Sequence, residues 1–223
     1  MAALDRFSPV ARAWFESAFE APTDAQDRGW EAISRGDHTL ILAPTGSGKT
    51  LAAFLWALDR LASEGTPADA KRRLRVLYVS PLKALTYDIE RNLRAPLAGI
   101  GQAAARLGLT RPEIQVGIRS GDTPADERRA FTRRPTDILI TTPESLFLLL
   151  TSSAREALRG VETVIVVLEG REDGEYHAGD ARFAPASPSI VDAAIALQPP
   201  VEQQRAGPPR LPVRGGQTEV AEE

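Results

Sequence analysis

A glycine-rich stretch, Ala43-Pro44-Thr45-Gly46-Ser47-Gly48-Lys49-Thr50, carries the residue types that hold phosphate groups. It ends an apolar run and precedes leucines at helical spacing, so it is predicted to join a strand to the first turn of a helix. The glycines let backbone N–H groups curl inward around an anion, and the helix N-terminus adds its positive dipole end. The stretch is therefore predicted to cradle the phosphates of a nucleotide, and the plain alternative is a chance Gly-Ser turn.

Lys49 and Thr50 have separate roles in such a loop. The Lys49 ammonium neutralises charge between the β and γ phosphates, and the Thr50 hydroxyl is a ligand for the Mg²⁺ that bridges them. The usual pattern begins with Gly, and Ala43 stands there, but the inner glycines still supply the bend. The nucleotide contacts are expected from Thr45, Gly46, Ser47, Gly48, Lys49 and Thr50.

The elements that must position this loop follow an α/β pattern from about Phe7 to Val166. Short runs that are apolar on both faces, as buried parallel strands are, occur at 39–43, 76–79, 114–116, 138–140 and 164–166. Helical patterns alternate with them, at 10–19, 24–35, 51–61, 82–102, 124–133 and 143–150. The alternation predicts a mostly parallel sheet covered by helices.

Length, composition and charge exclude several classes of protein. The 223 residues suit one α/β domain plus an appendage, and no stretch approaches the roughly 18 apolar residues of a membrane helix. Cysteine is absent, which excludes zinc–cysteine sites, and the N-terminus lacks a secretory pattern, so a cytoplasmic location is expected. His38 and His177 are too few for a metal cluster. With a net charge of −3, contacts to nucleic acid must come from local basic groups.

Segments before and after the phosphate loop carry a family resemblance. They read Phe19-Glu20-Ala21-Pro22-Thr23-Asp24-Ala25-Gln26, Ser80-Pro81-Leu82-Lys83-Ala84-Leu85, Arg119-Ser120-Gly121-Asp122-Thr123-Pro124 and Thr141-Thr142-Pro143-Glu144-Ser145-Leu146. In order and spacing they resemble the first RecA-like domain of superfamily 2 helicases, most closely the Lhr-like (large helicase-related) DEAD/DEAH-box ATP-dependent helicases. The resemblance implies a RecA-like P-loop NTPase fold, ATP and Mg²⁺ as cofactors, and single-stranded DNA or RNA as partner.

The resemblance also assigns roles to single residues. The first segment is similar to the Q motif, in which the Gln26 amide pairs with the adenine edge by donating and accepting at once; a glutamine on a helix surface is the plain alternative. In the family the other three segments face the bound strand. Their contacts fall on Pro81, Lys83, Gly121, Asp122, Thr123, Thr142 and Pro143. Taken alone, each of these segments is an ordinary helix start.

Two further clusters have plainer interpretations. Four arginines within residues 128–134 can attract nucleic acid, although such a run is more often a solvated helix face. Trp14, Trp30 and Trp56 fall at helical positions and are predicted to pack rather than to stack on bases.

The sequence departs from the family after Val166. In the family an Asp-Glu-x-His box follows this strand, with the Asp holding Mg²⁺ through water and the Glu activating the attacking water. Val167 and Leu168 stand at those two places here, and Glu169 is one place out of register, which on a strand turns a side chain to the opposite face. Glu169 is therefore a weak catalytic candidate, none is secure, and hydrolysis is expected to be feeble.

The remaining sequence predicts an incomplete motor. Residues 1–166 are expected to form a truncated ATP-binding domain and residues 167–223 a divergent, mostly disordered tail, in which only 190–197 can order, as a short strand or a helical turn. The Ser-Ala-Thr segment and the second RecA-like domain that motor activity requires are missing, so two central strands are expected to face a gap.

Other functions stay open on these residues. One alternative is a non-catalytic, nucleotide-dependent module that binds nucleic acid or a partner, and another is a non-functional product of a truncated or frameshifted gene. A different P-loop class, such as a small kinase, leaves the Q-like and TPES-like segments without explanation.

Overall fold

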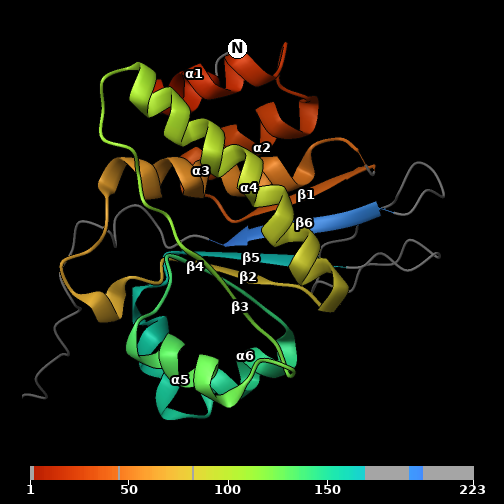
Figure 1. Cartoon of the computed structure of the whole chain (residues 1–223). Helices are drawn as coiled ribbons and strands as arrows, with labels where there is room; N and C mark the ends of the chain where they lie inside the picture. The colour runs from red at the N-terminus through yellow and green to blue at the C-terminus, as the bar shows by residue number, and fades with distance from the viewer. Residues whose placement is uncertain (1–2, 45, 82, 169–190, 198–223) are drawn as a thin grey trace, which may run out of the picture.

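The computed structural model describes residues 3–44, 46–81, 83–168 and 191–197. Its helical elements are η1 (Leu4–Arg6), α1 (Pro9–Ala18), α2 (Asp24–Ser34), α3 (Lys49–Glu64), η2 (Ala70–Arg72), α4 (Lys83–Arg106), α5 (Ala125–Arg133), α6 (Pro143–Leu150) and η3 (Ser153–Gly160). Its strands are β1 (Thr39–Pro44), β2 (Val76–Val79), β3 (Val116–Arg119), β4 (Ile138–Thr141), β5 (Thr163–Leu168) and β6 (Val191–Leu197). The predicted alternation of helices and strands is confirmed (Figure 1).

The strands form one sheet in the order β1-β6-β5-β2-β4-β3. Strands β5, β2, β4 and β3 pair in parallel, which confirms the predicted α/β class. Strand β6 runs antiparallel to both of its neighbours, β1 and β5.

The prediction of a gap between two central strands is wrong for the described residues, because β6 lies between β1 and β5. Ala193 of β6 pairs with Leu42 on one side and with Leu168 on the other. An empty place there would leave two rows of backbone N–H and C=O groups unpaired, which is costly away from water. Of the segment 190–197, expected as a strand or a helical turn, residues 191–197 therefore supply the strand at that place.

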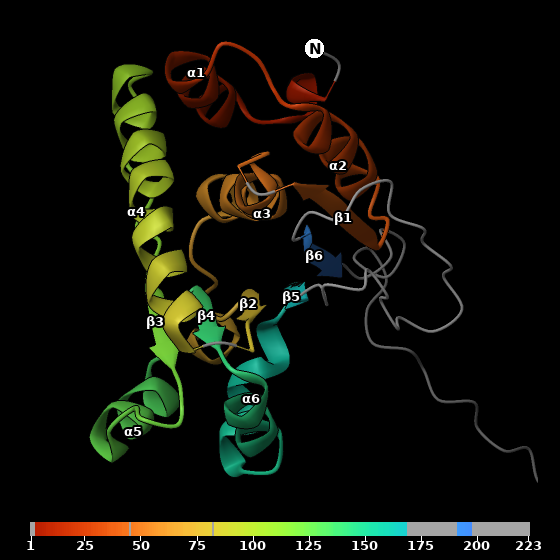
Figure 2. The same ribbon diagram turned by 90° about the vertical axis from the view of Figure 1, so that its right-hand side faces the viewer.

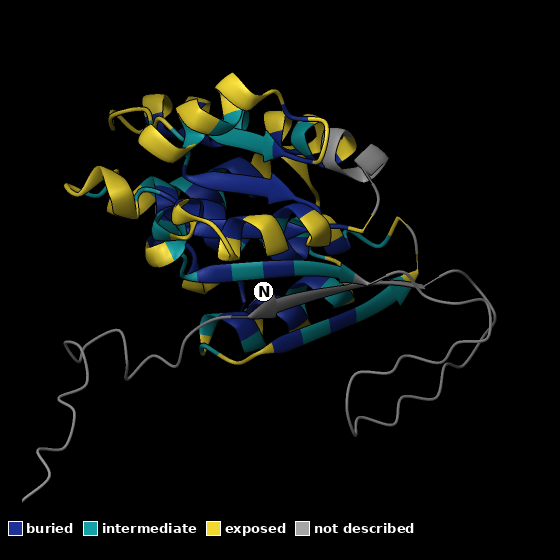
Figure 3. Cartoon of the chain, turned by 90° about the horizontal axis from the view of Figure 1, so that it is seen from below, coloured by how far each residue is buried: buried dark blue, intermediate teal, exposed yellow. Residues whose placement is uncertain are grey.

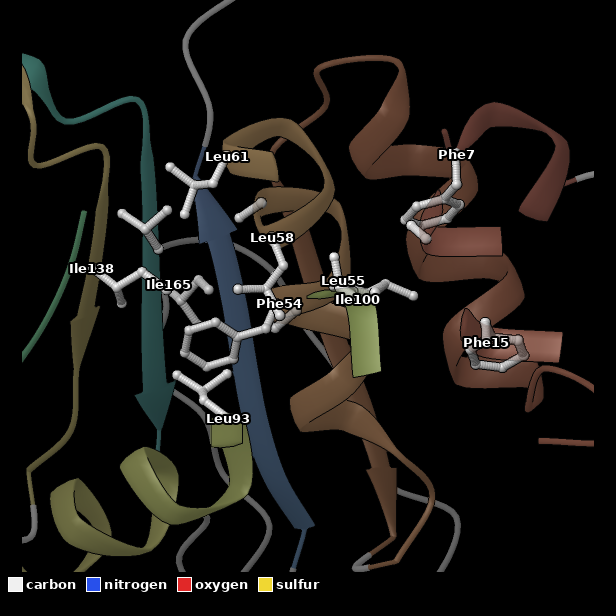
Figure 4. Close-up of a cluster of buried hydrophobic side chains, with 14 of the residues drawn as sticks. Phe7, Phe15, Phe54, Leu55, Leu58, Leu61, Leu93, Ile100, Ile138 and Ile165 are labelled. Atoms are coloured by element: carbon white, nitrogen blue, oxygen red, sulfur yellow. The ribbon is translucent and has the colours of Figure 1, made fainter. Parts of the chain in front are cut away.

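Helices cover both faces of the sheet. Helices α1 to α4 lie on one face, and α5 and α6 lie on the other (Figure 2). Alternate residues of a strand point to opposite faces: Ile138 and Ile140 join the larger hydrophobic cluster, and Leu139 joins the smaller one. Figure 4 shows Phe54, Leu58 and Ile165 within the larger cluster. Burial is concentrated in the sheet and exposure on the outer helices (Figure 3).

The tryptophans pack, as predicted. Trp30 has no exposed surface, and its indole N–H donates to the carbonyl of Ala52 at 3.1 Å. Phe7 and Phe15 meet Trp30 edge-on, with ring centroids 5.1 and 5.3 Å away. These contacts fix the N-terminal helices to α3, the helix that follows the phosphate loop.

Some elements differ from the sequence prediction. Strand β3 begins at Val116 rather than Ile114, because the carbonyl of Gln115 accepts from both Asp137 and Ile138 and the ladder starts after it. Helix α4 continues to Arg106 and contains Pro96. The short helix η3 was not predicted, and its first turn is capped by the Ser152 hydroxyl.

Candidate nucleotide site and nucleic-acid edge

The phosphate loop joins β1 to α3 as predicted. Gly46 and Gly48 have φ angles of 84° and 81°, a left-handed conformation that residues with a side chain rarely adopt. Gly48 is the N-cap of α3, and its carbonyl accepts from the Ala52 N–H at 2.9 Å. The loop therefore places its backbone at the positive end of a 16-residue helix. Thr45 lies outside the described residues.

The Q-like segment is fastened to this loop. Thr23 and Gln26 form a reciprocal capping box at the start of α2, in which the side-chain Oε1 of Gln26 accepts from the Thr23 N–H at 3.0 Å. The Thr23 hydroxyl donates to the Ser47 carbonyl at 2.8 Å, and the Gln26 amide donates to the Gly48 carbonyl at 3.4 Å. Because Gln26 is only 4% exposed, it is a structural support of the loop. Its pairing with adenine stays a prediction.

The charge of Lys49 is held inside the loop. Its ammonium donates to the carbonyls of Ala43 at 2.5 Å and Pro44 at 2.8 Å, and the side chain is 9% exposed. Phosphate oxygens are stronger acceptors for an ammonium than neutral carbonyls. The Ser47 hydroxyl is buried without a partner in the described structure, and Thr50 is exposed. This donor set fits a polyphosphate with its cation.

The other segments of the resemblance meet at the carboxyl edge of the sheet. Val79 is level with Thr141 and with Val166. Arg119 is level with Thr141 too. The residues that follow lie along one edge: Ser80, Ser120, Thr142 and Val167. The phosphate loop leaves β1 at the same edge, because β1 and β5 are both antiparallel to β6. Open α/β sheets bind their ligands at this edge.

Hydroxyls at this edge shape the turns. The Thr123 hydroxyl accepts from the Ser120 N–H at 2.8 Å, and the Ser120 hydroxyl accepts from the Asp122 N–H at 3.3 Å. The Thr142 hydroxyl caps α6 by accepting from the Ser145 N–H at 3.4 Å. Both threonines are buried, so capping, the plain interpretation of these segments, accounts for part of their chemistry.

The remaining residues predicted to contact nucleic acid also lie at the carboxyl edge. Gly121 and Asp122 are exposed in the turn after β3, and Pro143 is the first residue of α6. Pro81 follows β2 and is exposed, and Lys83 begins α4. The structure brings these residues together, and their contacts with nucleic acid stay a prediction.

The place to which the resemblance assigns the family's first carboxylate is apolar. Val167 continues β5 and packs, partly buried, against the larger cluster on the same face as Ile165. Within the described ranges, no three His, Asp or Glu side chains gather as a metal site. Glu169 and His177 lie outside those ranges, whereas His38 is an exposed loop residue directly before β1, as expected.

Two residues of this region escaped the sequence reasoning. Thr23 was part of the Q-like segment, and its T-x-x-Q spacing is a capping-box signal, but its bond to Ser47 spans 24 residues and has no local signal. The burial of Arg119 has no local signal either, because it follows from the sheet rather than from the neighbours of this residue in sequence.

These features define a P-loop nucleotide-binding domain. A strand leads through a left-handed glycine turn into the N-terminus of a helix, and further turns lie beside it at the carboxyl edge of the sheet. The chain belongs to the DEAD/DEAH box helicase family, whose sequence model matches residues 23–167. Among the helices described, none has the length and apolar character needed to cross a membrane.

Relatives narrow this assignment to the Lhr type. The chain is 62% identical over 163 residues to the Lhr helicase/probable uracil glycosylase of Mycolicibacterium smegmatis. It is 57% identical over 166 residues to the Lhr helicase/uracil glycosylase of Escherichia coli. Each match covers 73% of this chain but only 11% of the relative, so the chain spans about a tenth of their length.

Comparison with solved structures supports the same assignment. The structure of the Mycobacterium smegmatis helicase Lhr bound to ssDNA and AMP-PNP matches with a TM-score of 0.69 and 62% identity, covering 74% of this chain and 20% of that one. The DEAD-box helicase Mss116 bound to ssRNA matches with a TM-score of 0.55 at 19% identity, which supports the fold alone. The predicted resemblance to an Lhr-like helicase domain is thus confirmed.

Proposed function

We propose that this chain is the ATP-binding domain of an Lhr-like, ATP-dependent helicase, and that it binds ATP with Mg²⁺ and single-stranded DNA or RNA. The observation that carries the proposal is the phosphate loop, with two left-handed glycines at a helix N-terminus and the Q-like segment bonded to it. The Lhr structure bound to AMP-PNP and ssDNA supports both ligands.

Residues 46–50 of the loop each have a task in this proposal. The backbone N–H groups of Gly46 to Lys49 bind phosphate oxygens, the Lys49 ammonium exchanges its carbonyl partners for phosphate, and the Thr50 hydroxyl is the side chain that holds Mg²⁺. When bound, Mg²⁺ supplies neutralisation of the charge on the phosphates.

Hydrolysis by this chain is proposed to be slow. The positions of the family's Asp and Glu hold Val167 and Leu168, and a positioned base contributes about a hundred- to ten-thousand-fold to rate. Unwinding, the activity of a whole helicase, further requires the second RecA-like domain.

Nucleotide binding is the first test. A fluorescent ATP analogue with Mg²⁺ is titrated into the full chain, into Lys49→Ala, and into Lys71→Ala, a matched change at an exposed lysine of η2. We expect binding by the unmodified chain and by Lys71→Ala, and an affinity at least tenfold weaker in Lys49→Ala. No binding by any of the three proteins would refute the proposal.

A non-catalytic, nucleotide-dependent binding module is the second candidate, favoured by the apolar Val167. ATP turnover is compared between the unmodified chain, Lys49→Ala and the double variant Val167→Asp/Leu168→Glu, which restores the family's carboxylates. Turnover that is undetectable in the unmodified chain despite nucleotide binding supports the binding module. Slow turnover abolished by Lys49→Ala supports the helicase ATPase.

A further inference from the structure

A cleft of about 630 Å³ is lined by residues of the edge strand β3 and of helix α5. Helix α5 lies on the face of the sheet away from α1 to α4 (Figure 2). The alternation of side chains along β3 determines which of its residues face this cleft. Val116 and Ile118 pack into the larger cluster, so Gly117 and Arg119 face α5. Gly117 contributes no side chain there, and the Thr136 side chain lies against it, with its hydroxyl 2.8 Å from where a Cβ of residue 117 would stand.

Arg119 brings a buried positive charge to this cleft. Its side chain lines the cleft, yet the residue is only 9% exposed. Its Nη1 atom is buried and has no hydrogen-bond partner in the described structure. Burial, and after it the nearby Arg128 guanidinium, lower the pKa of Arg119. A guanidinium nitrogen buried without a partner is costly, and one explanation for keeping such a group is a bound ion or ligand that supplies the partner.

Further arginines surround Arg119 without neutralising it. The cleft is also lined by Arg128, Arg133 and Arg134. The Arg128 Nε–H donates to the Thr123 carbonyl at 2.7 Å, which ties this guanidinium to the turn at the carboxyl edge. Glu127, the acidic residue of the lining, is exposed, and none of these arginines forms an ion pair with it or any other described residue.

We propose that the cleft between β3 and α5 binds a phosphate group, with Arg119 as its buried cation and Arg128, Arg133 and Arg134 at its margin. Guanidinium groups are the preferred donors to phosphate oxygens. The phosphate comes either from the backbone of a nucleic-acid strand that continues past the Thr123 turn or from a free phosphorylated compound. The first source rests on the proposed function, and the second does not.

Inorganic phosphate is the probe that tests the cleft by itself. Thermal unfolding of the full chain is compared in chloride and in phosphate at equal ionic strength, in a Lys49→Ala background that weakens phosphate binding at the nucleotide loop. We expect phosphate at tenfold over its dissociation constant to raise Tm by about 3 °C or more. Arg119→Met should abolish this rise, and Arg129→Met should retain it, because Arg129 lies on α5 without lining the cleft.

The stability of Arg119→Met separates a binding role from a structural one. Methionine fills the same space without the unsatisfied charge, so the variant should be as stable as its parent in chloride, or more stable. A large loss of Tm in chloride would overturn the proposal, because it would show that Arg119 has partners in the folded protein. Failure of Arg119→Met to fold would likewise overturn the proposal, and Arg128→Gln/Arg134→Gln, which keeps Arg119, tests the margin of the cleft in the same phosphate comparison.

A fluorescent single-stranded oligonucleotide distinguishes the two sources of phosphate. If the strand crosses the cleft, Arg119→Met weakens its binding and makes the slope of log K against log salt shallower by about 0.7 for each lost contact. An unchanged oligonucleotide affinity with a lost phosphate effect assigns the cleft to a free phosphorylated compound. Failure of phosphate to raise Tm, with no change in the oligonucleotide titration, refutes the cleft proposal while leaving ATP binding untouched.

Discussion

The phosphate loop predicts different consequences for two glycines that share one backbone conformation. Gly46 and Gly48 both have a left-handed φ, so alanine at either place costs about 1–2 kcal/mol of backbone strain. A Cβ at Gly46 meets nothing within 4 Å, whereas a Cβ at Gly48 would lie 2.4 Å from the Gln26 amide nitrogen. Gly48→Ala therefore carries a second cost that Gly46→Ala does not.

The second cost is the displacement of Gln26. This side chain is 4% exposed and makes two hydrogen bonds, to Thr23 and to Gly48. Moving it aside forfeits both, at about 1 kcal/mol each. Gly48→Ala should thus lower the free energy of unfolding by about 3–4 kcal/mol, and Gly46→Ala by about 1–2 kcal/mol.

Urea unfolding followed by tryptophan fluorescence measures both changes. The deciding comparison repeats Gly48→Ala in a Gln26→Ala background, where the steric conflict is gone and the cost should fall to that of Gly46→Ala. Equal costs for the two glycines in the unmodified chain, or an unchanged cost of Gly48→Ala in the Gln26→Ala background, would refute the reasoning.

Three further changes test other parts of the domain. Burial raises the pKa of Asp59 more than its hydrogen bonds from Ser8 lower it. A raised folded pKa gives stability that is complete below the unfolded pKa near 4 and lost as pH rises through the folded pKa. The free energy of unfolding should therefore fall more steeply from pH 4 to 7 in the unmodified chain than in Asp59→Asn, and a steeper fall in the variant would be the wrong sign. Asp137→Ala removes a buried carboxylate that accepts hydrogen bonds from Arg73 at 3.1 Å and from the Gln115 N–H at 2.7 Å. Its loss should lower the free energy of unfolding in urea by about 2–4 kcal/mol. A loss below about 1 kcal/mol would contradict this prediction. Gly160→Ala places a Cβ 2.3 Å from the Arg72 carbonyl oxygen and should lower Tm by several degrees, whereas unchanged thermal unfolding would show that the η2–η3 contact is loose.

The sequence predicted most of the fold because its signals are local. Leucines at helical spacing after the phosphate loop predict α3, and the apolar run 138–140 predicts β4. Each of these patterns is contained in residues that are neighbours in the sequence. The start of β3 was placed two residues early, since it depends on hydrogen bonds from Asp137, 22 residues away from Gln115. Local patterns do not contain such pairings.

In the candidate site, too, the sequence predicts local features but not contacts between distant residues. The identity and spacing of Gly48 and Lys49 predict the turn, but not that Lys49 bonds to the carbonyls of Ala43 and Pro44. Nor does sequence distinguish Arg119 from the exposed Arg129, because only the sheet shows which arginine faces inward. Identity at a turn is local information, whereas burial depends on the whole fold.

The reversed direction of β6 determines the route of the polypeptide through the sheet. The chain enters this strand at Val191, beside Pro44 and the phosphate loop, and leaves it at Leu197, beside Val164. A strand parallel to β1 and β5 would instead end at the edge of the sheet that carries the phosphate loop. A fluorophore or affinity tag attached at residue 197 would therefore lie at the rim of the sheet opposite the phosphate loop, a strand's length from it.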